Sequence, residues 1–336
     1  VKFGDWFADS SFHLKAFGTS DGLLNRDTSG ARLLKKIFKS RFYPASYISK
    51  ANIFNPSLDR DVNNYMDDAG FASDGFPIIL QWNGEFRGIY IWRQRRENAN
   101  FRINDKVKEN IYLANSNTIN MQLNETFNHT QWELKSPKLS GYKENGEIPD
   151  ATVLANITRL HDWCKALTSK TVDFETTYNQ YINIENWVDV FIFNQVVGNW
   201  DYYWNNQNLV SWDGQKWSLF VSDLDWTVGL GDAASGDLNP AGLQWRGTFD
   251  RNIMYPLLLS RIKIRYNELR NNGVLNLNSI YDIYSDIPAK FGQDLYFKDI
   301  DYWTSYPNSN SGRFNVQFQM DWFTKKIAYL DNIWKL

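Results

Sequence analysis

Three polar residues between positions 201 and 223 have the types and the spacing that metal-assisted chemistry on phosphate groups needs. Asp201 and Asn206 lie five positions apart in a polar loop, and Asp223 follows 22 positions after Asp201. Carboxylate and amide oxygens are the hard ligands that Mg²⁺ prefers in proteins. A carboxylate can also orient a hydroxyl group for attack on a phosphoryl group. The three residues are therefore candidates for a phosphoryl-transfer site.

A predicted helix comes directly before this loop. Residues 184–198 are largely apolar, with Asn183 as a candidate N-cap and Gly198 as a candidate left-handed end of the helix. A helix that ends at Gly198 would hold Asp201 in the first turn of the loop that follows.

A predicted hairpin separates the loop from the second acid. The Asp-Gly pair at 213–214 supplies the turn between β-rich runs at 207–212 and 215–222. A tight hairpin places its two ends side by side, so Asp223 would lie close to Asn206. Protein kinases use this order: an acid, an amide five positions later, a hairpin and a metal-binding acid.

Each of these acids also has a plainer interpretation. Asp201 could cap a turn after the helix, and Asp223 could be a turn residue at the end of a strand. An isolated Asp-x4-Asn spacing favours that interpretation, because short motifs occur by chance. The combined order of helix, loop, hairpin and Asp-x-Asp favours the site. Asp225 could be a second metal ligand or a support for the loop, and the sequence leaves both open.

The other elements predict an α+β fold in two lobes. A second hairpin, 76–82 with 86–92, has the turn Asn83-Gly84, and residues 23–38 fit an early helix. Residues 95–150 are polar and predict a connection between lobes. Helices are expected at 151–167, 253–270, 277–290 and 316–334. One domain, 1–336, would then have a sheet-bearing lobe over about 1–150 and a mainly helical lobe over about 151–336.

Composition excludes several classes of protein. The formal net charge is −2, with 36 Lys+Arg against 38 Asp+Glu, which gives no reason to expect a nucleic-acid partner. No apolar run is long enough to span a bilayer. Cys164 is the only cysteine and predicts a small buried side chain, and the three histidines lack metal-ligand spacing. A chain rich in Trp and Asn and poor in Cys is typical of bacterial proteins outside the cytoplasm, at the cell surface or in the periplasm. A monomer is favoured.

The motifs together resemble the CotH kinase family, which is named for a spore-coat protein. The stretches that carry the resemblance follow the family's order along the chain: Phe12–Phe17 with Asp21 and Asn25-Arg26, Asn83–Tyr90, Phe193–Asn206 and Lys216–Gly229. They cover roughly residues 12 to 300, which is more specific than any single motif.

The resemblance implies a distant protein-kinase-like fold that uses ATP with Mg²⁺ or Mn²⁺ and phosphorylates hydroxyl groups of a protein substrate. It implies that Asp201 is the catalytic acid and that Asn206 and Asp223 hold metal. Lys15 and Arg26 are candidate phosphate contacts, although ordinary surface charges would look the same.

Three features depart from the family pattern. The family usually has a Glu six positions after the glycine of its Gly-x-Tyr motif, whereas this chain has Gln94. Gln94 is a candidate cofactor-binding residue because it stands at that position. If the family's Glu pairs with a lysine or helps to hold metal, the neutral amide removes that charge. The loop residues 202–204 are aromatic, where many relatives are more polar. The Arg-Gly-Asn-x-Thr block that often precedes the family's kinase core does not occur in this sequence. We expect it upstream in the native protein.

Two other functions remain open. A catalytically impaired, pseudokinase-like scaffold is consistent with Gln94. A glycan-binding or carbohydrate-active domain is suggested by the paired acids and by indole side chains, which stack on sugars when exposed. The tryptophans that motivate it are Trp82, Trp92, Trp200, Trp204, Trp212 and Trp226.

Overall fold

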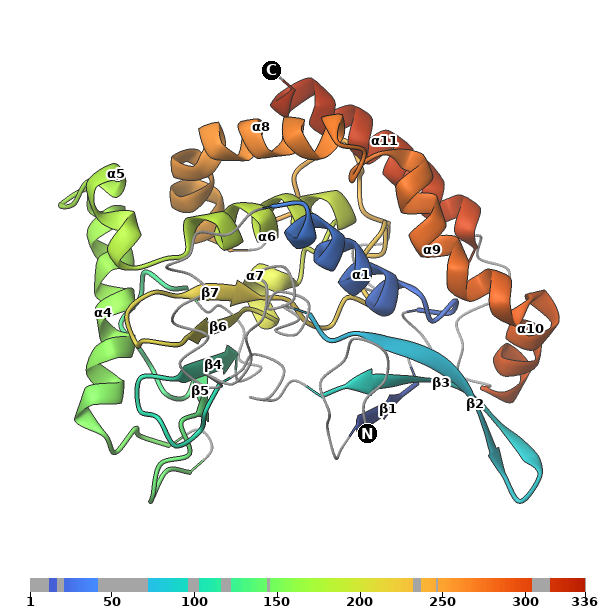
Figure 1. The fold of residues 1–336 in the computed structure, drawn as a ribbon, viewed down its shortest axis with the longest axis horizontal. Coiled ribbons are helices and arrows are strands. Elements are labelled where there is room, and N and C mark those ends of the chain that lie inside the picture. The colour runs from blue at the N-terminus through green and yellow to red at the C-terminus, as the bar shows by residue number, and fades with distance from the viewer. Residues whose placement is uncertain are drawn as a thin grey trace, which may run out of the picture.

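The structure is a computed structural model. It describes residues 12–16, 21–41, 72–95, 103–115, 122–143, 146–231, 237–245, 247–303 and 315–335. Two antiparallel sheets lie below a layer of helices, and helix α1 crosses above the gap between them (Figure 1). The predicted α+β, two-lobed fold is confirmed.

The first sheet has three strands in the order β1-β3-β2. Their bounds are Phe12–Lys15 for β1, Gly75–Trp82 for β2 and Glu85–Gln94 for β3. The hairpin between β2 and β3 turns at Asn83 and Gly84, whose φ angles are 53° and 80°, so an Asn-Gly pair suits this turn. Lys15 pairs with Ile91 and His13 with Arg93 in the register of β1 on β3.

The second sheet has four strands in the order β5-β4-β6-β7. Their bounds are Ile111–Asn115 for β4, Trp132–Ser136 for β5, Asn208–Ser211 for β6 and Ser218–Phe220 for β7. Strands β6 and β7 form the hairpin that the sequence predicts. The central strand β4 pairs with β6, so part of the polar region 95–150 belongs to the sheet that carries this hairpin.

Helices form the rest of the described fold. Their bounds are Arg26–Lys39 for α1, Ala151–Thr168 for α4, Phe174–Thr177 for α5, Ile184–Val197 for α6, Tyr202–Asn205 for α7, Tyr255–Asn271 for α8, Leu277–Phe291 for α9, Gln293–Tyr302 for α10 and Val316–Trp334 for α11. A 3₁₀ turn, η2, spans Tyr178–Gln180, and a π-helical turn, η3, spans Asp250–Met254. No helix of the described residues has the length and apolar character to cross a membrane.

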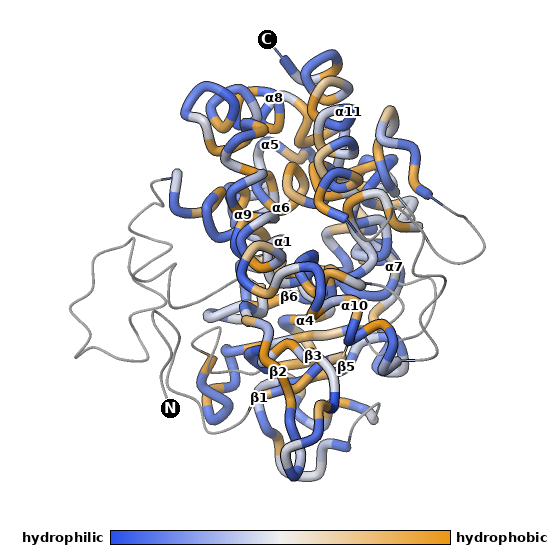
Figure 2. The backbone as a smooth tube through the Cα atoms, turned by 90° about the vertical axis from the view of Figure 1, so that its right-hand side faces the viewer, coloured by the Kyte–Doolittle hydropathy of each residue, from blue (hydrophilic) through white to orange (hydrophobic). Residues whose placement is uncertain are grey.

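Helix α6 lies at the centre of the molecule. It packs against α1, α8, α11 and β7, and its residues from Asn186 to Val197 are all buried. The outer helices α8 and α11 instead alternate hydrophilic and hydrophobic positions, as helices with one face in water do (Figure 2). A rigid, buried α6 gives the loop that follows it a fixed starting point.

The sequence predicted most element bounds within a few residues. Helix α11 spans 316–334 as expected, and Cys164 is buried on α4. The predicted N-cap position of Asn183 is confirmed. Asn183 occupies the N-cap position of α6 but caps no backbone N–H group with its side chain. Its amide nitrogen donates to the Ser218 hydroxyl at 2.7 Å, because β7 passes beside the start of the helix.

Candidate active site

A left-handed glycine ends α6 and begins the loop that carries Asp201. Gly198 has a φ angle of 67°, and its N–H group and that of Asn199 return to carbonyls of the last helical turn. A Cβ atom at Gly198 would lie 2.5 Å from the Trp322 ring of α11. Both the backbone angle and the ring require glycine here, so the direction in which the loop leaves the helix is fixed.

Two amide groups hold the Asp201 carboxylate. Asn205 donates to Asp201 Oδ1 and Asn206 donates to Asp201 Oδ2, both at 2.8 Å. Asp201 is the N-cap residue of α7, yet its side chain caps no backbone N–H group of that helix. The geometry therefore differs from the plain turn cap, because side-chain amides orient the carboxylate.

The ends of the β6–β7 hairpin bring Asp223 to the same place. Asn208 donates through Nδ2 to the Asn206 carbonyl at 2.7 Å and to the Ser222 hydroxyl at 3.1 Å. It therefore ties Asn206 to the residue beside Asp223. Asp223 itself has a φ angle of 60°, in the left-handed region that non-glycine residues rarely adopt. Convergence of the hairpin ends, which the spacing predicts, is present in the structure.

The loop that contains Asp223 is also tied to the loop that contains Asp201. Val228 N–H donates to the Val197 carbonyl at 2.6 Å, and the Trp200 indole donates to the Leu230 carbonyl at 2.9 Å. These bonds join the two acidic segments outside the sheet. Their relative position is thus set by three separate connections.

Two cations from the first sheet reach the Asp223 carboxylate. Lys15 Nζ forms an ion pair with Asp223 Oδ1, and Arg93 Nη1 lies 3.7 Å from the same oxygen. The register of β1 on β3 places Lys15 and Arg93 as diagonal neighbours on one face of the sheet. Lys15 was predicted as a phosphate contact, and here it lies beside the predicted metal ligand.

Arg93 is held in place by α1. Its Nη1 donates to Asp27 Oδ2 at 2.6 Å, and Asp27 Oδ1 accepts the Leu224 N–H group at 2.9 Å. Asp27 thus joins β3, α1 and the segment after Asp223 through one buried carboxylate. Neither Arg93 nor Asp27 was predicted from the sequence. Their isolated positions carry no motif, and only the fold brings them together.

Arg26 is buried rather than being a surface charge. Its side chain is fully enclosed, pairs with Asp21 at 3.3 Å and donates through Nε to the Thr227 carbonyl at 3.1 Å. Burial raises the pKa of Asp21 to about 6, although Arg26 acts in the opposite direction. Arg26 therefore holds the segment that follows Asp223 through its bond to Thr227.

The remaining predicted residues separate by position. Asp225 is 8% exposed, and its negative charge helps to raise the pKa of Arg93. Gln94 instead accepts the Asp74 N–H group through Oε1 at 3.2 Å, which fixes the end of β3 to the residue before β2. Alternation along a strand turns Arg93 and Gln94 to opposite faces. It is the arginine at 93 that faces Asp223.

Two aromatic residues of the loop, Tyr202 and Tyr203, belong to the core. Tyr202 and Tyr203 are buried and pack edge to face, and Tyr203 also contacts Phe191 and Trp245. This departure from the family pattern therefore affects packing beneath the loop.

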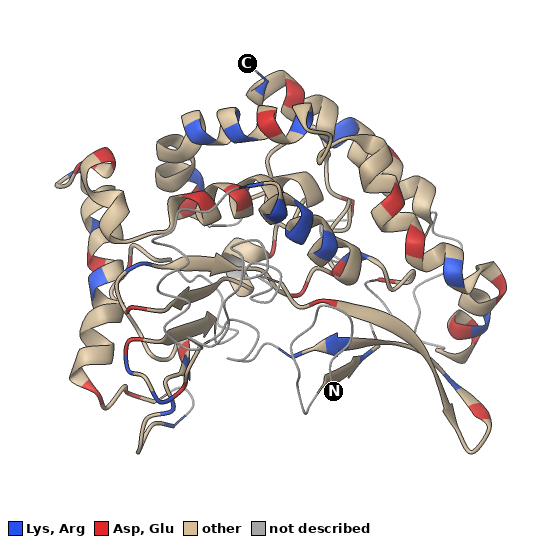
Figure 3. Cartoon of the chain, in the orientation of Figure 1, with Lys and Arg blue, Asp and Glu red and all other residues tan. Residues whose placement is uncertain are grey.

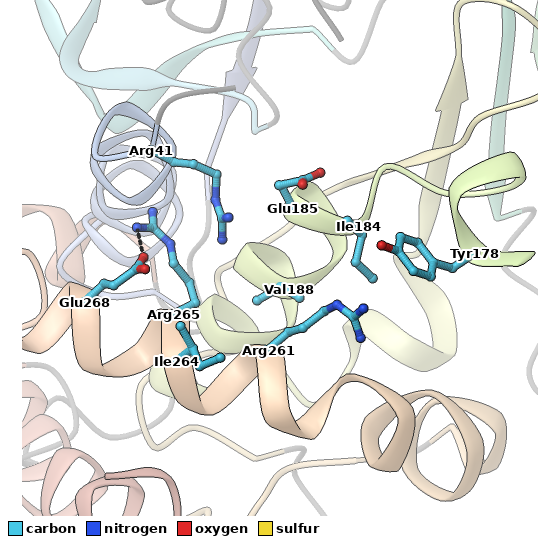
Figure 4. A pocket seen from close by; sticks show the side chains of 9 residues that line it. All are labelled: Arg41, Tyr178, Ile184, Glu185, Val188, Arg261, Ile264, Arg265 and Glu268. Carbon is cyan, nitrogen blue, oxygen red and sulfur yellow. Dashed lines mark hydrogen bonds and ion pairs between the residues drawn. The ribbon is translucent and has the colours of Figure 1, made fainter. Parts of the chain in front are cut away.

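A hollow that the site does not line lies elsewhere in the described part of the fold. About 240 Å³ in volume, it opens between α6 and α8 (Figure 4). Its lining residues are Arg41, Tyr178, Ile184, Glu185, Val188, Arg261, Ile264, Arg265 and Glu268. None of them belongs to the site around Asp223. The arginines are already paired, since Arg41 and Arg265 bind Asp189 and Arg261 binds Glu175.

The donor set suits a hard cation. Within the described ranges no three His, Cys, Asp or Glu side chains gather into a metal site. Asp223 offers a carboxylate and Asn206 an amide oxygen, since its nitrogen donates to Asp201. These are the oxygen types that Mg²⁺ accepts, and such sites are completed by phosphate oxygens and water. The chemical types of these two side chains fit a divalent cation that arrives with a phosphate ligand.

The fold is α+β in two lobes, Asp201 is bound by Asn206, and Asp223 at the other end of the hairpin pairs with two cations. This order of acid, amide, hairpin and acid is that of a kinase-like protein. A sequence model of the CotH kinase protein family matches residues 7–330, nearly the whole chain. The chain therefore belongs to the CotH kinase family. No curated protein sequence matches it.

Proposed function

We propose that this chain is an active atypical protein kinase, which transfers the γ-phosphoryl group of ATP to a hydroxyl group of a protein substrate. The observation that carries this proposal is the convergence of Asp201, Asn206 and Asp223 at the ends of one hairpin. Membership in the CotH kinase family supports the same reaction.

The proposal gives each side chain a separate role. Asp201, which two side-chain amides hold in place, orients the hydroxyl group of the acceptor and accepts its proton. Asp223 and Asn206 provide the oxygen ligands for a Mg²⁺ or Mn²⁺ ion. When bound, such an ion neutralises charge on the phosphate groups. Lys15 is 30% exposed, so its ammonium group can turn from Asp223 to a phosphate oxygen.

A thermal-shift titration tests the nucleotide site directly. A ligand that binds only the folded state raises the melting temperature with its occupancy. We expect ATP with Mg²⁺ or Mn²⁺ to stabilise the wild-type protein and to leave Asp223→Ala unchanged. Asp282→Ala, an exposed acid on α9, is the control and should respond like the wild type. No shift at millimolar ATP with either metal would refute the proposal.

Burial of the tryptophans weakens the glycan-binding alternative. Trp200 and Trp212 are 8% and 5% exposed, so their rings cannot stack on a sugar. Trp82 is 66% exposed, but it lies at the tip of the β2–β3 hairpin, away from the acids. Release of reducing sugars from a glycan panel, lost in Asp201→Ala, would favour a carbohydrate-active enzyme instead.

A further inference from the structure

Arg93 is a buried cation beside the predicted metal ligand. Its side chain is 5% exposed, and its guanidinium group lies between Asp27 and Asp223, from α1 and from the end of the β6–β7 hairpin. Figure 3 marks the charged residues of the chain, many of which belong to the helices and to the loops. A guanidinium group that is enclosed in this way is part of the site's architecture.

The charge of Arg93 is fixed by its surroundings. Burial alone would lower the pKa of its guanidinium group, but the carboxylates of Asp27, Asp223 and Asp225 outweigh burial and raise it. The hydrogen bond to Asp27 holds the group in one position. Arg93 thus places one permanent positive charge among three carboxylates.

Lys15 differs from Arg93 in its freedom to move. Both cations approach the same oxygen of Asp223, but the side chain of Lys15 is 30% exposed and that of Arg93 only 5%. A partly exposed ammonium group can turn away from Asp223 when a phosphate group enters. The guanidinium group cannot leave without breaking the bond to Asp27 inside the protein.

Protein kinases commonly hold two Mg²⁺ ions at the nucleotide phosphates, through the metal-binding Asp and the loop Asn. A fixed guanidinium group 3.7 Å from Asp223 Oδ1 neutralises part of the charge of that carboxylate and repels a further cation beside it. We propose that Arg93 takes the place of one metal ion, so that this chain binds ATP with a single divalent cation. This inference rests on the proposed function.

Counting bound Mn²⁺ ions tests it without measuring activity. Electron paramagnetic resonance gives the number of Mn²⁺ ions per chain at saturating concentrations of an ATP analogue with an imido bridge. We expect one ion in the wild-type protein. Two variants replace the guanidinium group by a neutral amide, namely Arg93→Gln and Arg93→Gln with Asp27→Asn. In these variants we expect a second ion that binds at least tenfold more tightly than any second ion of the wild type.

The second variant guards against misfolding, because it also removes the charge that Arg93→Gln leaves unpaired in the interior. Arg87→Gln is the matched control on the same strand. Arg87 is 40% exposed and pairs with Glu85, so the metal count should stay at one. Melting temperatures identify which variants are folded.

The possible outcomes separate this inference from the proposed function. Two ions per wild-type chain would overturn the role of Arg93 and leave the kinase proposal standing. One Mn²⁺ ion per chain in both the wild type and a folded Arg93 variant would also overturn the role of Arg93 and leave the kinase proposal standing. Absence of analogue binding to the wild type would overturn both.

Discussion

The two halves of the site are built in different ways. The acidic half, which consists of Asp201, Asn206 and Asp223, comes from one continuous stretch and is fixed by short-range bonds around one hairpin. The cationic half, which consists of Lys15 and Arg93, comes from two strands of the other sheet. Asp27 of α1 holds Arg93 beside Asp223, because it binds both Arg93 and the backbone of Leu224.

This difference indicates that the two halves of the site have separate roles. The acidic half keeps its geometry through its own hairpin, its loop bonds and the buried helix α6. The cationic half depends on contacts between distant segments, chiefly Asp27 of α1 with Arg93 of β3 and with the backbone of Leu224. Damage to the acidic side chains should therefore change chemistry, whereas damage to the cationic half should change stability and metal use.

The largest effect should come from Asp201→Asn. The amide keeps the shape of the carboxylate but cannot accept the proton of an acceptor hydroxyl. Loss of such a group lowers transfer by about 100- to 10,000-fold. Transfer of labelled phosphate to a protein acceptor measures this loss, while the thermal shift with ATP and metal should stay as in the wild type. No measurable transfer by either protein would support the scaffold interpretation, and equal measurable transfer by both would contradict the role of Asp201.

Much of the acidic half could be predicted from the sequence because its information is local. The turn at 213–214, the glycine at 198 and the acids at 201 and 223 all lie within 26 residues, and a hairpin has few possible geometries. The same holds for α11, whose apolar period gives its bounds directly.

The cationic half could not be predicted in this way. Nothing in the sequence around Asp27 or Arg93 indicates that they meet, since 66 positions separate them. Gln94 was predicted as a site residue from the family pattern. In the structure its amide oxygen accepts a hydrogen bond from the Asp74 N–H group. A strand alternates faces at every residue, so a neighbouring position can point into the site while the predicted one points away.

The second largest effect should come from breaking the buried pair of the cationic half. In Asp27→Ala the guanidinium group of Arg93 and the N–H group of Leu224 both lose a partner. Removal of one member of a buried ion pair costs about 3–5 kcal/mol. Chemical denaturation measures this loss. Glu85→Ala, which breaks the exposed pair with Arg87, should cost only about 0–1 kcal/mol. Equal losses in the two variants would contradict the structural role of Asp27.

A smaller effect should follow from Gly198→Ala, which tests how firmly the acidic half is fixed. A left-handed angle costs a non-glycine residue about 1–2 kcal/mol, and overpacking adds about 1–3 kcal/mol. The new methyl group would meet the Trp322 ring at 2.5 Å, so we expect both costs. At Gly84 φ is also positive, at 80°, but no atom lies within 4 Å of an added Cβ, so Gly84→Ala should show the backbone cost alone. Denaturation of both variants gives the difference.

Over a single pH unit, the smallest effect should be a change of stability with pH at the base of the acidic half. Burial raises the pKa of Asp250 to about 7, and its Oδ1 has no hydrogen-bond partner among the described residues. The unfolded chain releases this proton near pH 4. The protonated carboxyl therefore contributes stability that is full below pH 4 and is lost as pH rises to about 7. The difference in unfolding free energy between the wild type and Asp250→Asn should change by about 1.4 kcal/mol per pH unit within that window. Since other titrating groups are common to both proteins, a constant difference from pH 4 to pH 7 would show that Asp250 is ionised below the loop of Asp201.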